Sequence, residues 1–307
     1  MRILSIARFC RVLSIAGLSG VLAIIATTAQ SAQDGACNRE CLRDVMTQYL
    51  NAMVAHNPAG LPVAAGMRFT EDTVELKLGE GLWKDASRVG PYRQEVIDVR
   101  EGISGAHVVI EANGTPVLLA VRLKVVGGKI TEVETQATRN KEQGMLYNPD
   151  GLKALHQGMN DTPATHVSRA EMIRVASIYP SGMKAGSFVV ADVPFAADAY
   201  RFENGQMMAG KGCNFRPPSC EDIKGPTFKP PTKMDYRVLA VDEELGLVWL
   251  RMNLGDRGEA NQTTDLIAFE MFKVHDGKFH GVEAFLRMDP AGKASGWDDK
   301  YPPQIPK

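Results

Sequence analysis

The sequence lacks several features that would place it in a well-defined functional class. It has no block of Lys or Arg, and 35 basic residues against 36 acidic ones give a net charge of −1, which argues against an electrostatic nucleic-acid binder. No serine lies in a G-x-S-x-G pattern and no phosphate-binding glycine loop follows a strand, so hydrolase triads and nucleotide binding have no support. None of the six histidines shows H-x-x-x-H or H-E-x-x-H spacing, and we therefore expect no metal site.

The first 32 residues have the pattern of an export signal. Three arginines and no acidic residue precede or accompany the start of an apolar stretch, Val12–Thr28, and small residues follow it. This pattern predicts a signal peptide over residues 1–32 and a secreted or periplasmic protein. The alternative is an uncleaved membrane anchor, because the apolar stretch is nearly long enough to span a bilayer.

Cysteine is scarce, with five residues in the chain. Cys10 would be removed with the signal peptide, which leaves Cys37, Cys41, Cys213 and Cys220. An even number of cysteines in an exported protein predicts disulfide bonds. Three pairings are open, and local pairing of Cys37 with Cys41 and of Cys213 with Cys220 needs the fewest assumptions. The alternative, four thiolates on zinc, is disfavoured by the C-x3-C and C-x6-C spacings.

An internal repeat is the most informative feature of the sequence. Leu61–Glu71 is similar to Val193–Gly205, and Leu123–Glu134 is similar to Phe272–Glu283. The blocks occur in the same order but are further apart in the second copy. We therefore expect an insertion there, where Cys213, Cys220 and several prolines lie.

Each copy begins with a predicted helix, Glu40–Ala55 in the first and Arg169–Met183 in the second, from apolar residues at helical spacing. Ser168 and Glu171 form a capping box, and Pro180 is expected to end or kink the second helix. Strands follow in predicted hairpins: Thr115–Val126 with Ile130–Ala137, Arg237–Val241 with Leu247–Met252, and Asp265–Val274 with Phe279–Met288.

This order of elements, closed by Val126–Glu134 and by His275–Glu283, resembles the nuclear transport factor 2-like fold in its SnoaL-like branch. Phe195–Gly205 and Val241–Gly246 are similar to segments of secreted tandem SnoaL-like proteins. The resemblance implies an α+β fold: two tandem cone-shaped domains, each a curved antiparallel sheet packed on helices around an apolar cavity. It also implies chemistry without metal or organic cofactor.

The expected domains follow from the repeat and the resemblance. A first SnoaL-like domain covers residues 37–139, a linker covers 140–167, a second domain covers 168–290, and 291–307 form an extended tail. Single domains of this kind commonly pair through their sheets. We therefore expect the two domains to pair within one chain.

Two carboxylates are the predicted catalytic residues. Glu283 would share a strand face with Phe279 and Phe285, a setting that suits a general acid or base. Asp198, which follows Pro194 near the start of a strand, is the second candidate base. The alternative for Glu283, and for its equivalent Glu134, is an ion pair with an arginine across the sheet.

The predicted substrate-binding residues surround these carboxylates. Arg201 would anchor an anionic or carbonyl group, with further contacts from Glu203, Tyr236, Arg237, Phe279 and Phe285. The alternative is that Glu203–Gly205 is only a turn and that the Tyr–Arg pairs only cover a sheet edge.

Two functions remain open from the sequence. The first is an exported, cofactor-independent lyase, dehydratase or isomerase that acts on a small apolar or aromatic molecule in the second copy. The second is a non-catalytic module that binds such a molecule or another protein. A buried carboxylate beside an arginine in an apolar cavity would favour the enzyme, and a cavity without a carboxylate would favour the binding module.

Overall fold

The computed structural model describes residues 37–154, 158–215, 219–231, 233–255 and 263–307. The predicted signal peptide, including Cys10, lies outside the described residues. Gly35–Lys307 form one compact unit. Within the described part of the chain, no helix combines the length and the hydropathy that crossing a membrane requires.

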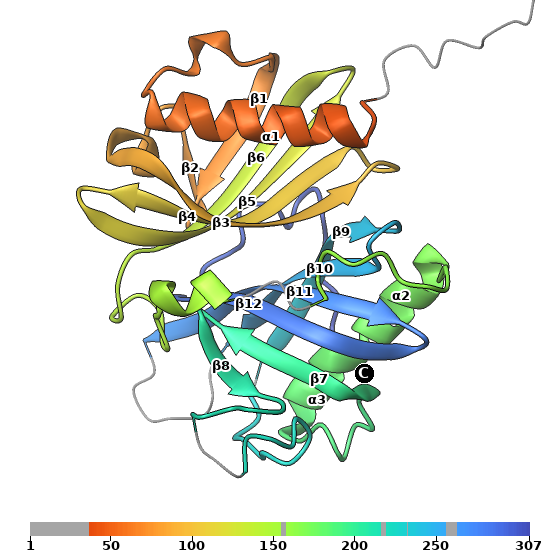
Figure 1. Ribbon diagram of the computed structural model, residues 1–307. Helices are drawn as coiled ribbons and strands as arrows, with labels where there is room; N and C mark the ends of the chain where they lie inside the picture. The colour runs from red at the N-terminus through yellow and green to blue at the C-terminus, as the bar shows by residue number, and fades with distance from the viewer. Residues whose placement is uncertain (1–36, 155–157, 216–218, 232, 256–262) are drawn as a thin grey trace, which may run out of the picture. The chain divides into compact units, whose positions relative to one another are not determined.

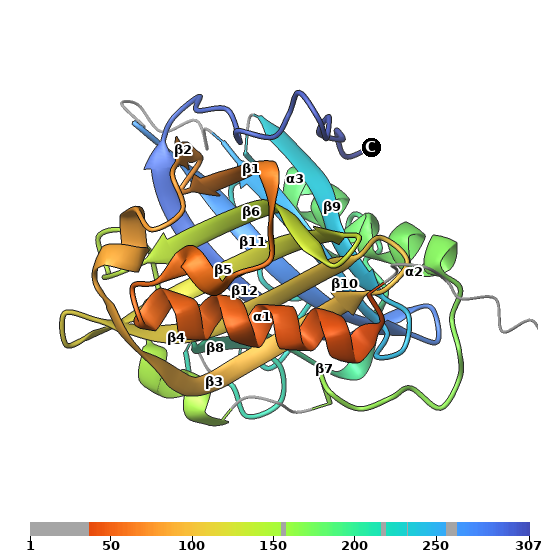
Figure 2. The ribbon, with the colours of Figure 1, turned by 90° about the horizontal axis from the view of Figure 1, so that it is seen from above.

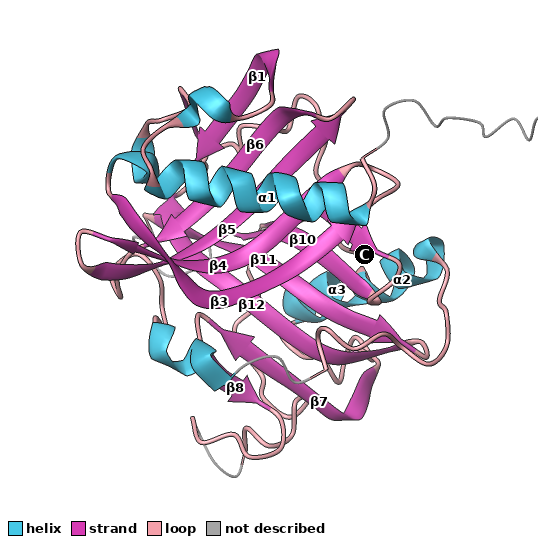
Figure 3. Cartoon of the chain, turned by 45° about the horizontal axis from the view of Figure 1, so that its top comes forward, coloured by secondary structure: helices cyan, strands magenta, loops and turns pink. Residues whose placement is uncertain are grey.

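Two six-stranded sheets with the same strand order form the framework of the described structure (Figure 3). The first has the order β2-β1-β6-β5-β4-β3, with strands β1 (Val63–Glu71), β2 (Val74–Leu76), β3 (Ala86–Asp98), β4 (Ile103–Ala112), β5 (Thr115–Val126) and β6 (Lys129–Thr138). The second has the order β8-β7-β12-β11-β10-β9, with strands β7 (Phe195–Glu203), β8 (Gln206–Ala209), β9 (Met234–Asp242), β10 (Leu247–Leu254), β11 (Thr264–His275) and β12 (Lys278–Pro290). In each sheet one pair is parallel, β1 with β6 and β7 with β12. The internal repeat is therefore a repeat of sheet topology.

Both predicted helices begin within one residue of the expected position, and the second is interrupted near Pro180, as the sequence predicts. Helix α1 (Arg39–Val54) is capped by Asn38, and α2 (Arg169–Ala176) is capped by Ser168. A second short helix, α3 (Ile178–Ala185), follows directly. Pro180 lies in the first turn of α3. A proline inside a helix clashes with the carbonyl group four residues earlier, but in the first turn its missing N–H costs no helical hydrogen bond. Short 3-10 helices cover Pro58–Gly60, Gly81–Lys84 and Pro149–Ala154.

The predicted α+β fold, with two cone-shaped domains packed on helices, is wrong. Among the described residues, strands account for 45% and helices for 17%, so this part of the chain consists of two β-rich halves. The physical reason is the length of the strand-forming segments. β3, β5, β11 and β12 each have 12 or 13 residues, and little of either half remains for helical layers.

The helices and the two sheets are stacked in layers (Figures 1 and 2). Three clusters of buried side chains lie between these layers. Helix α1 packs on one face of the first sheet, where Met46 and Phe69 are buried together. Helices α2 and α3 pack on one face of the second sheet, where Tyr179 and Phe272 are buried. The remaining faces of the two sheets contribute to a third cluster that includes Trp249 and Phe285.

Both disulfide bonds follow the local pairing. Cys37 is bonded to Cys41 beside the start of α1, and Cys213 is bonded to Cys220 in the segment between β8 and β9. That segment is the insertion expected in the second copy. The zinc alternative is therefore wrong.

The C-terminal residues, predicted as an extended tail, pack against the first sheet. Trp297 is buried, and its Nε1 donates a hydrogen bond to Thr70 Oγ1 at 2.8 Å. Tyr301 donates its hydroxyl hydrogen bond to Glu132 at 2.9 Å. The domain boundaries assigned from the sequence stay a prediction.

Candidate functional site

A ligand-sized cavity with buried charged groups in its lining lies on the helix-facing side of the second sheet. The cavity has a volume of about 280 Å³ and is lined by Met145, Leu146, Met183, Arg201, Glu203, Met208, Phe215, Phe228, Leu254, Leu266, Glu270 and Leu286. An adjoining hollow of about 460 Å³ shares Arg201, Met208 and Phe215 with it. The lining is apolar except for one arginine and two glutamates, which is the usual composition of a small-molecule site.

The register of three neighbouring strands brings the polar side chains together. Glu203 on β7 pairs with Ala284 on β12, and Ala284 pairs with Glu270 on β11. The two glutamates therefore flank one small side chain on the same face of the sheet. Arg201 lies two residues before Glu203 on that face, since side chains alternate along a strand.

Arg201 connects the polar groups. Its Nε lies 3.1 Å from Glu203 Oε1, and its guanidinium lies 5.5 Å from the centre of the Phe188 ring. Although burial lowers the pKa of Arg201, contacts with Tyr179 and Glu203 outweigh this and raise the pKa above its ordinary value. The Arg201–Glu203 contact is an ion pair without an aligned hydrogen bond, because Nε has no hydrogen-bond partner among the described residues.

Glu270 is the buried carboxyl group of the cavity, with an exposed fraction of 3%. Burial raises its pKa to about 8; the charge of Glu203 adds to the rise, whereas Arg201 and a hydrogen bond from Tyr179 oppose it. Its Oε2 has no hydrogen-bond partner within the described part of the chain. An unsatisfied buried polar atom costs free energy, so its presence beside a cavity requires an explanation.

The arrangement has the components of proton-transfer chemistry. A carboxyl group whose pKa is near neutral pH can act both as a base and as an acid. Arg201 can donate hydrogen bonds to a substrate oxygen beside Glu270. The Tyr179 hydroxyl, whose pKa burial raises well above its ordinary value, donates its hydrogen bond to Glu270.

The first sheet has the same strand order without the equivalents of Arg201 and Glu270. By strand register, Phe69 on β1 occupies the position of Arg201, since it pairs with Val133 as Arg201 pairs with Val282. In the same way Val121 on β5 occupies the position of Glu270. Both first-sheet side chains are apolar and buried. The same sheet topology therefore forms with apolar side chains at these two positions.

The raised pKa of Glu270 predicts a stability difference that depends on pH. The carboxyl group ionises at about pH 4.5 in an unfolded chain and at about 8 in the folded one, so the folded state holds more protons between these values. Wild-type stability contributed by this group should therefore fall as the pH rises from 4.5 to 8. Glu270→Gln removes the ionisation, and its stability advantage over wild type should grow over this window to a few kcal/mol, on the order expected for such a shift.

Urea unfolding of the two proteins at several pH values checks this expectation. Other titrating groups cancel in the difference between wild type and variant. A difference that stays constant from pH 4 to pH 9 would contradict it.

Of the residues predicted from the sequence, the cavity contains Arg201 and Glu203. Asp198 is on β7 but has an 85% exposed side chain, and its Oδ1 lies 3.7 Å from His280 Nδ1. Tyr236 is buried in the helix-facing cluster of the second sheet. Arg237 forms an ion pair with Glu134 on the first sheet. The ion-pair alternative therefore holds for Glu134.

Glu283 lies on the opposite face of the second sheet from the cavity. Its Oε1 is 3.0 Å from His107 Nδ1, and Trp249 Nε1 donates to His107 Nε2 at 3.2 Å. The His107 ring stacks on Phe285 with centroids 4.3 Å apart. Because Nε2 of His107 accepts from Trp249, the neutral imidazole carries its hydrogen on Nδ1 and donates it to Glu283. Glu283 is thus the hydrogen-bond acceptor for a buried histidine between the two sheets.

Phe279 does not share the face of Glu283 as the alternation predicted. It is buried with Tyr179 in the helix-facing cluster, with ring centroids 5.9 Å apart. The pairing of β12 shifts register between Phe279 and Gly281. An irregularity of this kind changes which side chains share a face.

Two site residues were missed by the sequence reasoning. Glu270 is the one charged residue on a strand face that otherwise carries Leu266, Ala268, Phe272 and Val274. This exception to the alternation was a usable signal. Tyr179 belongs to the predicted apolar stripe of its helix, and nothing in the sequence separates it from ordinary core residues.

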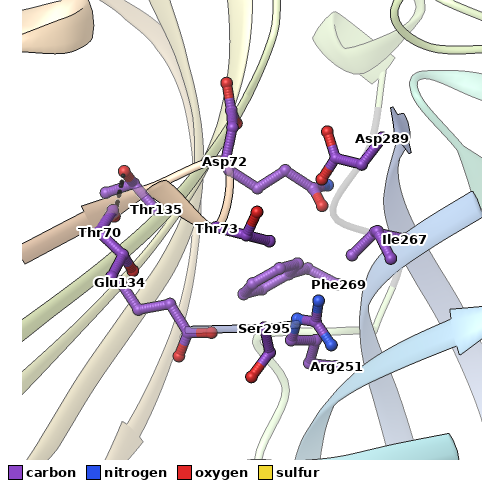
Figure 4. Close-up of a pocket in the computed structure, with 11 residues that line it drawn as sticks. Thr70, Asp72, Thr73, Glu134, Thr135, Arg251, Ile267, Phe269, Asp289 and Ser295 are labelled. Carbon is purple, nitrogen blue, oxygen red and sulfur yellow. Dashed lines mark hydrogen bonds between the residues drawn. The ribbon is translucent and has the colours of Figure 1, made fainter. Parts of the chain in front are cut away.

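A much smaller hollow lies between the two sheets and has no room for an organic ligand (Figure 4). It has a volume of about 10 Å³ and includes Asp72, Glu134, Arg251 and Asp289 in its lining. That is room for about one water molecule. Several polar atoms face it without a hydrogen-bond partner among the described residues, including Glu134 Oε2 and Arg251 Nη2.

Comparison with known proteins gives a domain family without an assigned function. Residues 165–286 match the profile of a domain of unknown function (DUF8021), and this range contains the cavity residues Arg201, Glu203 and Glu270. No curated protein matches the chain. Among solved structures, the chain is similar to a de novo designed protein with a curved β-sheet, at 21% identity and a TM-score of 0.27, over 34% of this chain and 89% of that one.

Proposed function

We propose that the chain is an exported protein that binds a small, largely apolar molecule in the cavity of its second half and catalyses a cofactor-independent proton transfer on it. The observation that carries this proposal is the buried Glu270, which has an unsatisfied oxygen and lies beside a fixed cation, Arg201, in the lining of an apolar cavity. Disulfide bonds are typical of oxidising compartments and support export.

The substrate that fits these groups carries a carbonyl or a similar oxygen. As a carboxylate, Glu270 takes a proton from the carbon next to the carbonyl group, and the electron pair moves to the carbonyl oxygen. Arg201 stabilises the negative charge there. In a substrate with a β,γ double bond, return of the proton to the γ-carbon moves the double bond to the α,β position and completes an isomerisation. Loss of a leaving group from the β-carbon completes a lyase reaction instead, and a departing hydroxyl group that takes the proton back from Glu270 leaves as water and completes a dehydration.

A mixed metabolite pool incubated with the mature protein tests the proposal. We expect liquid chromatography–mass spectrometry to show one compound converted by wild type and unchanged by Glu270→Gln. An unchanged pool with one compound retained on the protein would replace the enzyme with the non-catalytic binding module. A pool that is neither converted nor bound would contradict both functions.

A further inference from the structure

The β11–β12 hairpin brings two histidines and an aspartate together at one end of the second sheet. His275, Asp276 and His280 each offer a ligand atom, and these atoms lie within 4.8 Å of one another. The two imidazole rings stack with centroids 3.5 Å apart. His275 Nδ1 lies 3.0 Å from Asp276 Oδ2. The spacing of the histidines in the sequence does not match a metal motif, and the turn of the hairpin is what brings them together.

Neighbouring segments hold and extend this cluster. Thr165, in the segment before α2, donates a hydrogen bond from its Oγ1 to Asp276 Oδ1 at 2.6 Å. The Asp198 carboxylate on β7 lies 3.7 Å from His280 Nδ1. A hydroxyl that orients a carboxylate in this way is the usual outer partner of a metal ligand.

The corresponding hairpin of the first sheet folds without any of these groups. β5 and β6 pair Val126 with Lys129 as β11 and β12 pair His275 with Lys278, and a register shift follows in both. The positions of His275, Asp276, His280 and Asp198 are there taken by Val126, Gly127, Thr131 and Gly66. The cluster is therefore not a requirement of the hairpin.

We infer that His275, Asp276 and His280 form a binding site for a late first-row divalent cation such as Zn²⁺, with Asp198 within reach as a fourth ligand. Two imidazole nitrogens and a carboxylate oxygen suit Zn²⁺ and disfavour Mg²⁺ and Ca²⁺, which prefer oxygen alone. The cluster is open to solvent, since the Asp276 side chain is 58% exposed and that of His275 is 21% exposed. A bound ion would link β7, β11 and β12.

Calorimetric titration of the mature protein with Zn²⁺ tests the inference. We expect one ion per chain, no measurable binding by His280→Gln, and an intermediate loss of about tenfold for Thr165→Val, the usual effect of removing an outer partner. His166→Gln is the matched control, because His166 is an exposed histidine outside the cluster. It should bind Zn²⁺ as wild type does.

Thermal unfolding gives a second readout and checks folding of the variants. Zn²⁺ should raise the midpoint of wild type and of His166→Gln but not that of His280→Gln, because binding to the folded state stabilises it. If His280→Gln and His166→Gln lowered the Zn²⁺ affinity equally, the ion would be binding non-specifically to surface histidines. That result would overturn the proposed site. So would Mg²⁺ binding as tightly as Zn²⁺.

Discussion

Turnover by the Glu270→Gln variant should be lower than that of wild type by about 10²- to 10⁴-fold, the usual contribution of a positioned general acid or base. The substitution keeps the shape of the side chain and an oxygen that accepts from Tyr179, but an amide cannot take up the substrate proton. The effect should fall on kcat more than on KM, since the lost interaction belongs to the transition state. Measurement of both constants, once the metabolite pool has supplied a substrate, checks this result.

The pH profile separates loss of the base from loss of structure. Wild-type kcat/KM should rise with a pKa near 8, the value that burial gives Glu270, because the base must be ionised to react. The residual rate of Glu270→Gln should lack that rise. Glu283→Gln is the matched control, since Glu283 is also a buried strand glutamate but lies on the face towards His107. If Glu283→Gln abolished turnover in a folded protein while Glu270→Gln did not, the assignment of the base would be wrong.

Periodicity and turn chemistry predicted the local elements well. The hairpin at Gly127–Gly128, the hairpin at Asp276–Gly277 and the helix start at Ser168 all lie where the sequence places them. These features depend on a few neighbouring residues, such as glycines that adopt positive φ in the turns. The repeat of two similar blocks also predicted that the two halves share a topology.

The assembly of those elements was not accessible in the same way. The resemblance implied helices as the main support of each sheet, but strands account for 45% of the described residues and helices for only 17%. The site depends on which residues of β7, β11 and β12 stand opposite one another, and register is a property of three segments at once. A single irregularity between Phe279 and Gly281 was enough to put Phe279 and Glu283 on different faces.

The first sheet offers a design for removing the proposed site while keeping the fold. The double variant Arg201→Phe/Glu270→Val gives the second sheet the residues that Phe69 and Val121 supply in the first. Replacing a buried charged group by well-packed apolar side chains is often neutral or stabilising by about 1–4 kcal/mol. We expect the double variant to unfold at the same or a higher urea concentration than wild type, and to neither convert nor retain the substrate.

The single variant Arg201→Phe should behave in the opposite way. It removes the cation and leaves Glu203 and Glu270 on one sheet face without it, and breaking a buried pair in this manner costs about 3–5 kcal/mol. The cost should be largest above pH 8, where Glu270 is ionised. A double variant as unstable as the single one would mean that Arg201 and Glu270 are needed for folding of the second half. A stable double variant that has lost the ligand would mean that this half gives up stability to hold a charged pair for its substrate.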